Sequence, residues 1–431
     1  MVITLRKMKV DDADFVLSIR NNLETRKYLH NSDTFTKDQF IKWFAENSPE
    51  WYIISSDGIE AGYIRSKWMD VKKTNLQVGI DIALEHRGKK IAFETYRHLE
   101  KKCHDKMIEK MSLEVLDSNP RGLALYEKLG FIQTGAYGHF NNFGSLFSIE
   151  MEKPIQNLTN KSLKIISCWF GDRRGDWQGK HGPTISLDMF QRIIKKEIEL
   201  DKGIDCDTLF VVNDAEDLHS DSVYQDCMSL VLSYNNTQTR NGRIMVETRP
   251  NKGLSFACFD YGFNKYCEDY DFFYFLEDDQ VILKEHTLKN DIDKYKTLDN
   301  NAGFIATVGM DFAVEPHCHG ACGVSSRNVL KIVNSKTYSE TLKRNCLPHW
   351  DKDGPGAAGH EGAAEVPFTN LIHKSGYDLL NADNKKFFVS WLANWLRNCH
   401  GEAERLVYWK ENLKRILFII FMNLLCPCFE F

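Results

Sequence analysis

The chain has 431 residues, of which 43% are hydrophobic and 27% are charged, and its formal net charge is −5. These values exclude a disordered chain and a polytopic membrane protein, and the lack of a basic excess argues against a nucleic-acid partner. The length exceeds what one hydrophobic core normally serves, which predicts two α/β domains. The twelve cysteines are scattered and the first residues lack the apolar core of a signal peptide, so we expect a cytoplasmic protein with reduced thiols.

A strand, a turn and a helix start follow one another early in the chain. Residues 75–82 have the pattern of a strand that ends at Ile82, and residues 91–101 have apolar side chains at helical spacing. Free backbone N–H groups and the positive end of the helix dipole favour a phosphate or pyrophosphate between them. The residues that we expect to bind it are Arg87, Gly88, Lys89, Lys90, Ile91 and Ala92.

A second strand and helix follow, with Asn119 between them, Tyr126 on the helix and Gly130-Phe131 at its end. Together with the first turn, this segment resembles the GNAT acetyltransferases, whose fold is a mixed twisted sheet with flanking helices. The resemblance implies acetyl-CoA as cosubstrate, with Ile82 and the turn at the cofactor and Asn119 at its pantetheine arm. It also implies that Tyr126 protonates the departing CoA thiolate, a proton that a phenol can donate. The family usually has glycine where this chain has Lys90.

The amino-terminal stretch bears on the acceptor substrate. Residues 18–22, 26–28 and 35–44 resemble acetyltransferases that act on nucleotide-linked amino sugars, notably of the pseudaminic-acid pathway, whereas a neighbouring subfamily acetylates ribosomal-protein N-termini. The general base stays open between a water relay and four side chains: His30, Asp81, Glu114 and His139.

We place the first domain at residues 1–155 and a polar linker at 156–161. A second domain follows the linker. Strands and helices alternate again from residue 162, which predicts a mostly parallel sheet with ligands at the carboxyl ends of its strands. Polar residues follow two of these strands: Asn213 and Asp214 after the first, and Arg249, Asn251 and Gly253 after the second.

The apolar strand at 271–276 runs directly into Glu277, Asp278 and Asp279. Three carboxylates at the end of a buried strand would repel one another without a cation, and a divalent ion with a nucleotide sugar's diphosphate would relieve that conflict. From residue 162 to about 395 the chain resembles the GT-A glycosyltransferases of the family 2 type, which have a nucleotide-sugar-binding Rossmann-like sheet. The resemblance implies Mn²⁺ or Mg²⁺ at Glu277 and Asp279, and nucleotide-sugar contacts at Asp278 and at the polar residues of the two other strand ends.

A catalytic base for this second reaction is expected near the start of a later helix. The family's base lies one helix length before a Gly-Tyr pair, and Glu365 precedes Gly376-Tyr377 in this way. A carboxylate in that place can activate an acceptor hydroxyl. Because Ala364 replaces an acid often found before the base, Glu361 is a rival for this role.

The chain closes with a tail at 401–431, after a glycosyltransferase-like domain at 162–400. Its apolar run after Lys414-Arg415 is too short to span a bilayer comfortably. We expect it either to lie on a membrane surface, with acylation at Cys426 or Cys428, or to pack on protein.

These features predict a bifunctional carbohydrate enzyme. One domain would acetylate the amine of a nucleotide-linked amino sugar, and the other would transfer a sugar from a nucleotide to a glycan or a lipid-linked acceptor. Two alternatives stay open. The first domain would instead acetylate protein N-termini or lysines, or one domain would be an inactive binding module.

Overall fold

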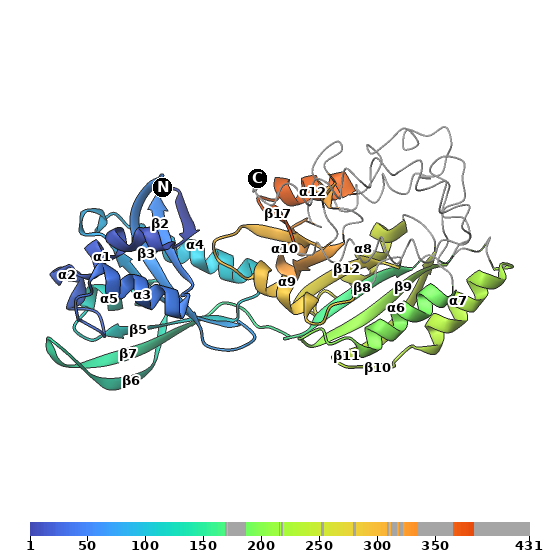
Figure 1. The fold of residues 1–431 in the computed structure, drawn as a ribbon, viewed down its shortest axis with the longest axis horizontal. Helices are drawn as coiled ribbons and strands as arrows, with labels where there is room; N and C mark the ends of the chain where they lie inside the picture. Colours follow the sequence, from blue (N-terminus) through green and yellow to red (C-terminus); the bar gives the residue numbers. More distant parts are fainter. Residues whose placement is uncertain are drawn as a thin grey trace.

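The computed structural model describes residues 1–168, 170, 187–214, 216, 219–250, 254–278, 282–307, 310–311, 317–318, 322–333 and 365–382. Within these residues it contains two separate β-sheets with helices on both faces of each (Figure 1). The last strand of the first sheet ends at Pro154 and the first strand of the second sheet begins at Ser162, on either side of the predicted linker. The α/β class with two sheets is therefore confirmed.

The first sheet has seven strands in the order β1-β2-β3-β4-β5-β7-β6. They are β1 (Ile3–Lys7), β2 (Trp51–Ser56), β3 (Ile59–Trp68), β4 (Asn75–Ile82), β5 (Lys110–Leu116), β6 (Ile132–Asn141) and β7 (Gly144–Pro154). All neighbours are antiparallel except β4 and β5, which are parallel because α4 connects them. β6 and β7 form a long curved hairpin at one edge (Figure 1).

Five helices cover the two faces of this sheet: α1 (Ala13–Arg20), α2 (Leu23–Arg26), α3 (Lys37–Asn47), α4 (Ile91–Asp105) and α5 (Pro120–Lys128). α1 and α3 pack through Val16 and Phe40 on the face that carries Ile53 and Tyr63. α4 packs on the opposite face through Leu99 and Cys103. The strands keep alternate residues for the two faces, as the period of a β-strand requires.

The second sheet has eight strands among the described residues, in the order β10-β11-β9-β8-β12-β16-β13-β17. They are β8 (Ser162–Cys168), β9 (Cys206–Asp214), β10 (Gln238–Thr239), β11 (Gly242–Pro250), β12 (Phe272–Glu277), β13 (Ala302–Ala306), β16 (Gly323–Ser326) and β17 (Asp378–Asn381). β11, β9, β8 and β12 are parallel, whereas β16 is antiparallel to both of its neighbours. A short separate pair joins β14 (Met310–Asp311) to β15 (His317–Cys318).

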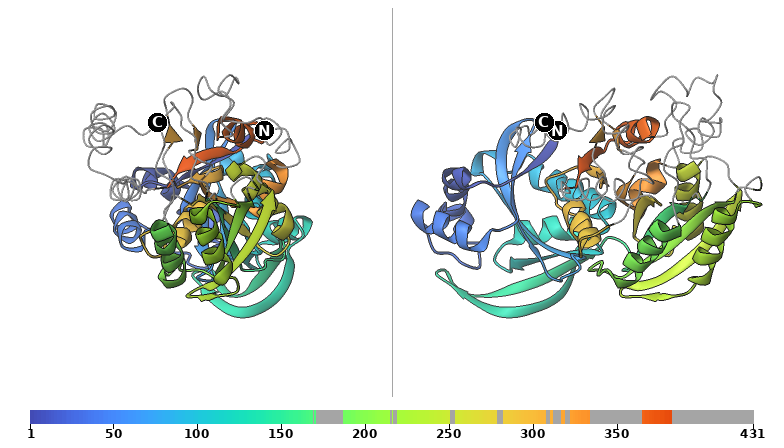
Figure 2. Two further views of the ribbon diagram at one scale, coloured as in Figure 1. Left: turned by 90° about the vertical axis from the view of Figure 1, so that its right-hand side faces the viewer. Right: turned by 45° about the vertical axis from the view of Figure 1, so that its right-hand side comes forward.

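Helices lie on both faces of the second sheet: α6 (Leu187–Glu199), α7 (Ser222–Ser233), α8 (Leu254–Tyr266), α9 (Thr287–Tyr295), α10 (Arg327–Val333) and α12 (Glu365–Lys374). One core joins α6, α7 and α9 to one face, and another joins α8, α10 and α12 to the other. Figure 2 shows this sandwich from the side. Seven cysteines are free thiols in the structure: Cys103, Cys168, Cys206, Cys227, Cys258, Cys267 and Cys322.

The two sheets are joined through the carboxyl end of α4, which lies between them in Figure 1. Lys106 Nζ donates to the carbonyl of Tyr295 at 2.5 Å and to Asn300 Oδ1 at 2.7 Å. One core of each half also contains a residue from the other half: Met107 belongs to a core of the second sheet, and Leu298 to the core between the first sheet and α4. The sequence pattern predicts a helix only to residue 101, and α4 continues to Asp105, where the second half covers it.

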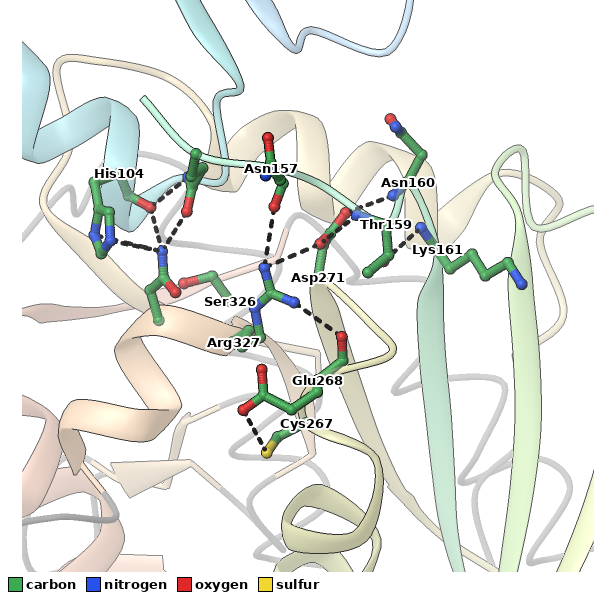
Figure 3. Close-up of polar contacts among 12 residues, drawn as sticks. His104, Asn157, Thr159, Asn160, Lys161, Cys267, Glu268, Asp271, Ser326 and Arg327 are labelled. Carbon is green, nitrogen blue, oxygen red and sulfur yellow. Dashed lines mark hydrogen bonds and ion pairs between the residues drawn. The ribbon is translucent and has the colours of Figure 1, made fainter. Parts of the chain in front are cut away.

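The segment between the sheets is held by side chains of the second half (Figure 3). The carboxylate of Asp271 accepts the backbone N–H groups of Thr159 at 3.0 Å and Asn160 at 2.7 Å, and it pairs with Arg327 at 3.6 Å. The hydroxyl of Ser326 donates to the carbonyl of Asp105 at 2.7 Å. These contacts fix the path of the chain between the two sheets.

Candidate active site

The first sheet opens between β4 and β5. These strands pair only at Asn75 with Lys110, Leu76 with Met111 and Gln77 with Ser112. Beyond that point β4 stays with β3 as far as Ile82, and β5 stays with β7 as far as Leu116. The carboxyl halves of two adjacent strands therefore separate, and backbone groups along the split are free to meet a bound extended molecule.

The predicted turn lies at the start of α4, separated from β4 by a short 3-10 helix at Leu84–His86. Gly88 and Lys90 both have a left-handed backbone, with φ of +76° and +63°, and Lys90 supplies no side-chain cap. The first N–H groups of a helix have no intrahelical acceptor, and the helix dipole makes this end positive. Lys89 and Lys90 are exposed, whereas Ile91 and Ala92 begin the helix. This donor set fits the pyrophosphate of acetyl-CoA.

Arg87 has a different position from the one that its place in the turn implies. Its guanidinium donates to the Ile82 carbonyl at 2.9 Å, to the Glu24 carbonyl at 3.2 Å and to the Thr25 hydroxyl at 2.5 Å. These bonds fasten the turn to α2 and to the end of β4. A direct bond from this side chain to phosphate would require it to leave them, so the structure favours a supporting role for Arg87.

Asn119 and Tyr126 lie on α5, on the other side of the split. Asn119 is the N-cap, and its Oδ1 accepts the Gly122 N–H at 2.9 Å, which leaves the amide NH₂ to donate to a ligand. Tyr126 is half-buried and packs edge-on against Tyr96 of α4, with ring centroids 5.5 Å apart. Burial raises the pKa of the Tyr126 phenol, so it is protonated at neutral pH.

Three of the four candidate bases, His30, Glu114 and His139, lie close together beside the split. His30 Nε2 is 2.7 Å from Ser148 Oγ and 3.6 Å from Glu114 Oε2, and its ring lies 4.8 Å from that of His139. Burial lowers the pKa of His30, so the imidazole is neutral at pH 7. Glu114, on β5, also accepts from Tyr137 at 2.9 Å and from Gln77 at 3.0 Å.

The fourth candidate, Asp81, lies apart from this network at the far end of β4. Its Oδ2 is 3.2 Å from Arg65 NH2, on β3. The sequence gives no signal for Arg65, Tyr96, Gln77, Tyr137 or Ser148, because these residues come from separate elements and share no motif. Only the fold brings them to the split.

Comparison with known proteins identifies this first half. A family model described as "Acetyltransferase (GNAT) domain" matches residues 3–132. Over 130 residues, which are 29% of this chain and 78% of the relative, the sequence is 32% identical to the Bacillus subtilis (strain 168) protein named "Putative ribosomal protein bS18-alanine N-acetyltransferase". The chain belongs to the GNAT acetyltransferase family. Its GNAT domain is an acetyl-CoA-dependent N-acetyltransferase domain.

Solved structures are similar to the same part of the chain. An N-acetyltransferase from Staphylococcus aureus Mu50 is 19% identical, with 36% of this chain and 100% of that chain covered and a TM-score of 0.32. The spermidine N-acetyltransferase from Vibrio cholerae in complex with CoA and spermine is 21% identical, with 35% and 95% covered and a TM-score of 0.33.

Outside the GNAT domain, the polar residues predicted at the strand ends of the second sheet share one edge. Arg249 pairs with Asn213 in the register of β11 and β9, and Arg249 NH1 donates to Asn213 Oδ1 at 2.7 Å. Asn213 is 2% exposed, yet its Nδ2 has no hydrogen-bond partner. Asp214 accepts from Tyr224 and from His219, both at 2.7 Å, and these bonds lower its pKa.

The acidic strand end lies at the same edge. β12 pairs with β8 as far as Glu277, and the N–H of the buried Asp278 donates to the Ser167 carbonyl at 3.0 Å. Asp279, Asn251, Gly253 and Glu361 lie outside the described residues, and Glu365 is described only as the first residue of α12. Within the residues that the structure covers, no group of three His, Cys, Asp or Glu side chains forms a metal site.

The predicted tail at 401–431 also lies outside the described residues. Among the helices that are described, none is long and apolar enough to cross a membrane.

Proposed function

We propose that the GNAT domain acetylates the amine of a nucleotide-linked amino sugar, and that the second domain transfers a sugar from a nucleotide to a glycan or lipid-linked acceptor. The observation that carries the proposal is the second sheet. Without the two-residue edge strand β10, the sheet has the order β11-β9-β8-β12-β16-β13-β17. If these seven strands are numbered along the chain from β8, this order is 3-2-1-4-6-5-7, and among them only the sixth strand, β16, is antiparallel to its neighbours. Polar side chains lie at the carboxyl ends of β9, β11 and β12, where α/β sheets bind nucleotides.

The residues at the split support the first reaction. Glu114 would accept a proton from the acceptor amine as it attacks, because its carboxylate is held by Gln77 and Tyr137 and is partly open to solvent. The neutral His30 beside it would pass that proton on. Tyr126, protonated at neutral pH, would donate a proton to the sulfur of the leaving CoA.

For the second reaction, the donor set at the sheet edge fits a nucleotide sugar. Asn213 and Arg249 would hold the nucleotide, and Asp214 its ribose. Glu277 and Asp279 would hold Mn²⁺ or Mg²⁺, which would neutralise the diphosphate leaving group, and Asp278 would contact the nucleotide sugar. Glu365 would accept the proton of the acceptor hydroxyl.

The first experiment is an assay of released CoA thiol on the full chain with UDP-, GDP- and dTDP-linked amino sugars. We expect turnover with at least one of them. We expect a loss in Tyr126→Phe of about a hundredfold, the usual scale for a general acid. Asp279→Ala should keep acetyl transfer and lose glycosyl transfer. Acetylation of none of these sugars would contradict the proposal.

A second candidate acceptor is a protein N-terminus, and the similarity to the Bacillus subtilis relative favours it. Peptides that begin with alanine or serine test it in the same assay. Peptide turnover with kcat/KM well above that of every amino sugar would replace the first proposal with this one.

A further inference from the structure

The hairpin of β6 and β7 exposes four aromatic side chains. Tyr137 is 42% exposed, Phe140 79%, Phe143 44% and Phe147 58%. Single apolar residues are common on the surface of a soluble protein, but a group of large ones marks a surface that binds a partner. Phe140 and Phe147 share one face of the hairpin, because Phe147 pairs with residue 138 and residues 138 and 140 lie on the same side of β6.

The other face of this hairpin belongs to the acetyl-transfer site. Its Tyr137 donates to Glu114 at 2.9 Å, and its His139 Nε2 lies 2.8 Å from the His30 carbonyl. The segment after α2 therefore contacts that face. The face with the two phenylalanines is separate from these contacts and stays open to solvent.

β6 is also an open edge of the first sheet. It ends the strand order, and among the strands that the structure describes only β7 pairs with it (Figure 1). After an irregularity at residues 133–135, its pairing with β7 is regular as far as Asn141. The N–H and C=O groups on the outer side of such a strand can pair with a further strand.

This edge lacks the charged side chains that normally keep an edge strand from pairing with another chain. No Asp, Glu, Lys or Arg occurs from Phe131 to Ile149. The strand at the opposite edge of the same sheet, β1, carries Arg6 and Lys7. The lack of basic residues also disfavours an anionic membrane or a nucleic acid as the partner. The surface therefore suits an uncharged protein strand.

A second copy of this chain supplies a strand with these properties. Two copies of β6 can pair antiparallel about a two-fold axis perpendicular to the sheet, which joins like faces and brings the phenylalanines of both copies together. The exposed parts of the four rings amount to about two whole aromatic side chains, or roughly 400 Å² per copy. With the paired backbones, the two copies would bury about 1,000 Å² or more, which is the size that a specific interface needs.

We propose that the chain forms a two-fold symmetric dimer through β6, in which the first sheets of two copies join into one continuous sheet. Phe140 and Phe147 of each copy pack against those of the other. The proposal does not depend on the acceptor of the acetyl group. It has a consequence for the site, because the same strand carries Tyr137, and pairing of its outer edge steadies the residue that holds Glu114.

The test measures the mass of the full chain by sedimentation equilibrium at micromolar concentration. We expect twice the 49.9 kDa of one chain. Phe140→Glu combined with Phe147→Glu should raise the dissociation constant about a hundredfold or more, because like charges replace paired rings. Both side chains are exposed, so the circular dichroism spectrum should not change. Val71→Glu replaces an apolar residue outside the hairpin that is 86% exposed, and this matched control should stay dimeric.

Hydrogen exchange locates the interface in the wild type without a substitution. The outward amides of residues 136–141 should exchange slowly in the dimer and rapidly after dilution below the dissociation constant. A wild type that stays monomeric at micromolar concentration would overturn the proposal. Slow β6 exchange in such a monomer would assign the edge to another segment of this chain, and binding to phosphatidylcholine vesicles would assign it to a membrane. Unchanged dimerisation of the double variant would also overturn it, because the interface would then lie elsewhere.

Discussion

At the scale of single residues, side chains from three other parts of the chain contact one carboxylate at the split in the first sheet, that of Glu114 on β5. Glu114 is held by Gln77 of β4 and Tyr137 of β6, and His30 lies beside it from the segment after α2. Two of these contacts fix the carboxylate's orientation. Glu114 is otherwise exposed, as the proposed contact with the acceptor amine requires.

We expect Glu114→Gln to lower kcat for acetyl transfer by about a hundredfold at pH 7, the scale of a lost general base. The KM for acetyl-CoA should stay close to that of the wild type, because the substitution leaves the start of α4, the predicted pyrophosphate site, unchanged. Steady-state kinetics of CoA release measure both constants. Glu46→Gln, an exposed position on α3, is the matched control. An unchanged kcat in Glu114→Gln would assign the base elsewhere.

Lys90 occupies a backbone conformation that suits glycine, with φ of +63°. A side chain in that region costs about 1–2 kcal/mol, so Lys90→Gly should raise the free energy of unfolding by roughly 1 kcal/mol. Lys89→Gly, one residue earlier and outside the left-handed region, should lower it or leave it unchanged. Denaturant titration of the two variants decides the matter. A fall in stability for Lys90→Gly would mean that its side chain makes a contact that outweighs the strain.

At the scale of elements, α5 depends on the close approach of Asn119 and Gly122. An added Cβ at Gly122 would lie 2.7 Å from Asn119 Nδ2, so only glycine leaves room for the side chain that caps the helix. The cap orients the same amide that we expect to contact the pantetheine arm of acetyl-CoA. A local packing requirement is thus tied to cofactor binding.

We expect Gly122→Ala to displace the Asn119 side chain and to raise the KM for acetyl-CoA several-fold, since a lost N-cap bond is worth about 1 kcal/mol. Gly138→Ala on β6 adds the same methyl group where no atom lies within 4 Å, and its KM should not change. Kinetics at varied acetyl-CoA concentration compare the two. An unaltered KM in Gly122→Ala would show that Asn119 does not contact the cofactor.

Local signals in the sequence account for much of these elements. A few adjacent residues determine each of three features, so these are predictable: the turn before α4, the cap at Asn119 and the strand that ends at Glu277. The pairing of Arg65 with Asp81 and the meeting of His30 with Glu114 depend on strand order and register. The antiparallel direction of β16 is likewise set by the whole sheet. No short pattern encodes such long-range contacts.

At the scale of the whole molecule, three lysines lie where the two halves meet, of which Lys106 and Lys296 are buried and Lys102 is half-buried. Lys102 of α4 donates to the Asn300 carbonyl at 2.8 Å, and Lys106, directly after α4, donates to Asn300 Oδ1 at 2.7 Å. Lys296 donates to the Lys72 carbonyl at 2.9 Å. Burial lowers the pKa of Lys106 to about 7, and those of Lys102 and Lys296 to about 8. In the sequence these residues look like an ordinary charged helix end, so the contact between the halves was not predictable from them.

The stability of the chain should therefore rise with pH above neutrality. The folded pKa of Lys106 is about 7 against an ordinary value of 10.5, so between these values the unfolded chain binds more protons. Deprotonation relieves the cost of burying the charge, and we expect the free energy of unfolding to rise by roughly 2 kcal/mol from pH 7 to pH 9. Denaturation midpoints across that range measure the slope. Lys106→Met should flatten it, while the exposed Lys67→Met should not; equal slopes in the wild type and Lys106→Met would contradict the assignment.

The exchange of Met107 and Leu298 between the cores has a consequence for the history of this gene. Two enzymes that merely share a chain can be separated again by one recombination event in the linker. Here such a cut would leave a leucine-sized cavity in one product and a methionine-sized cavity in the other. It would also expose the two buried lysines to solvent. Large cavities of that kind cost about 2–5 kcal/mol each, a sizeable share of a domain's stability. Loss of either half should therefore destabilise the half that remains. Descendants that lose one half should carry compensating substitutions at the positions of Met107 or Leu298.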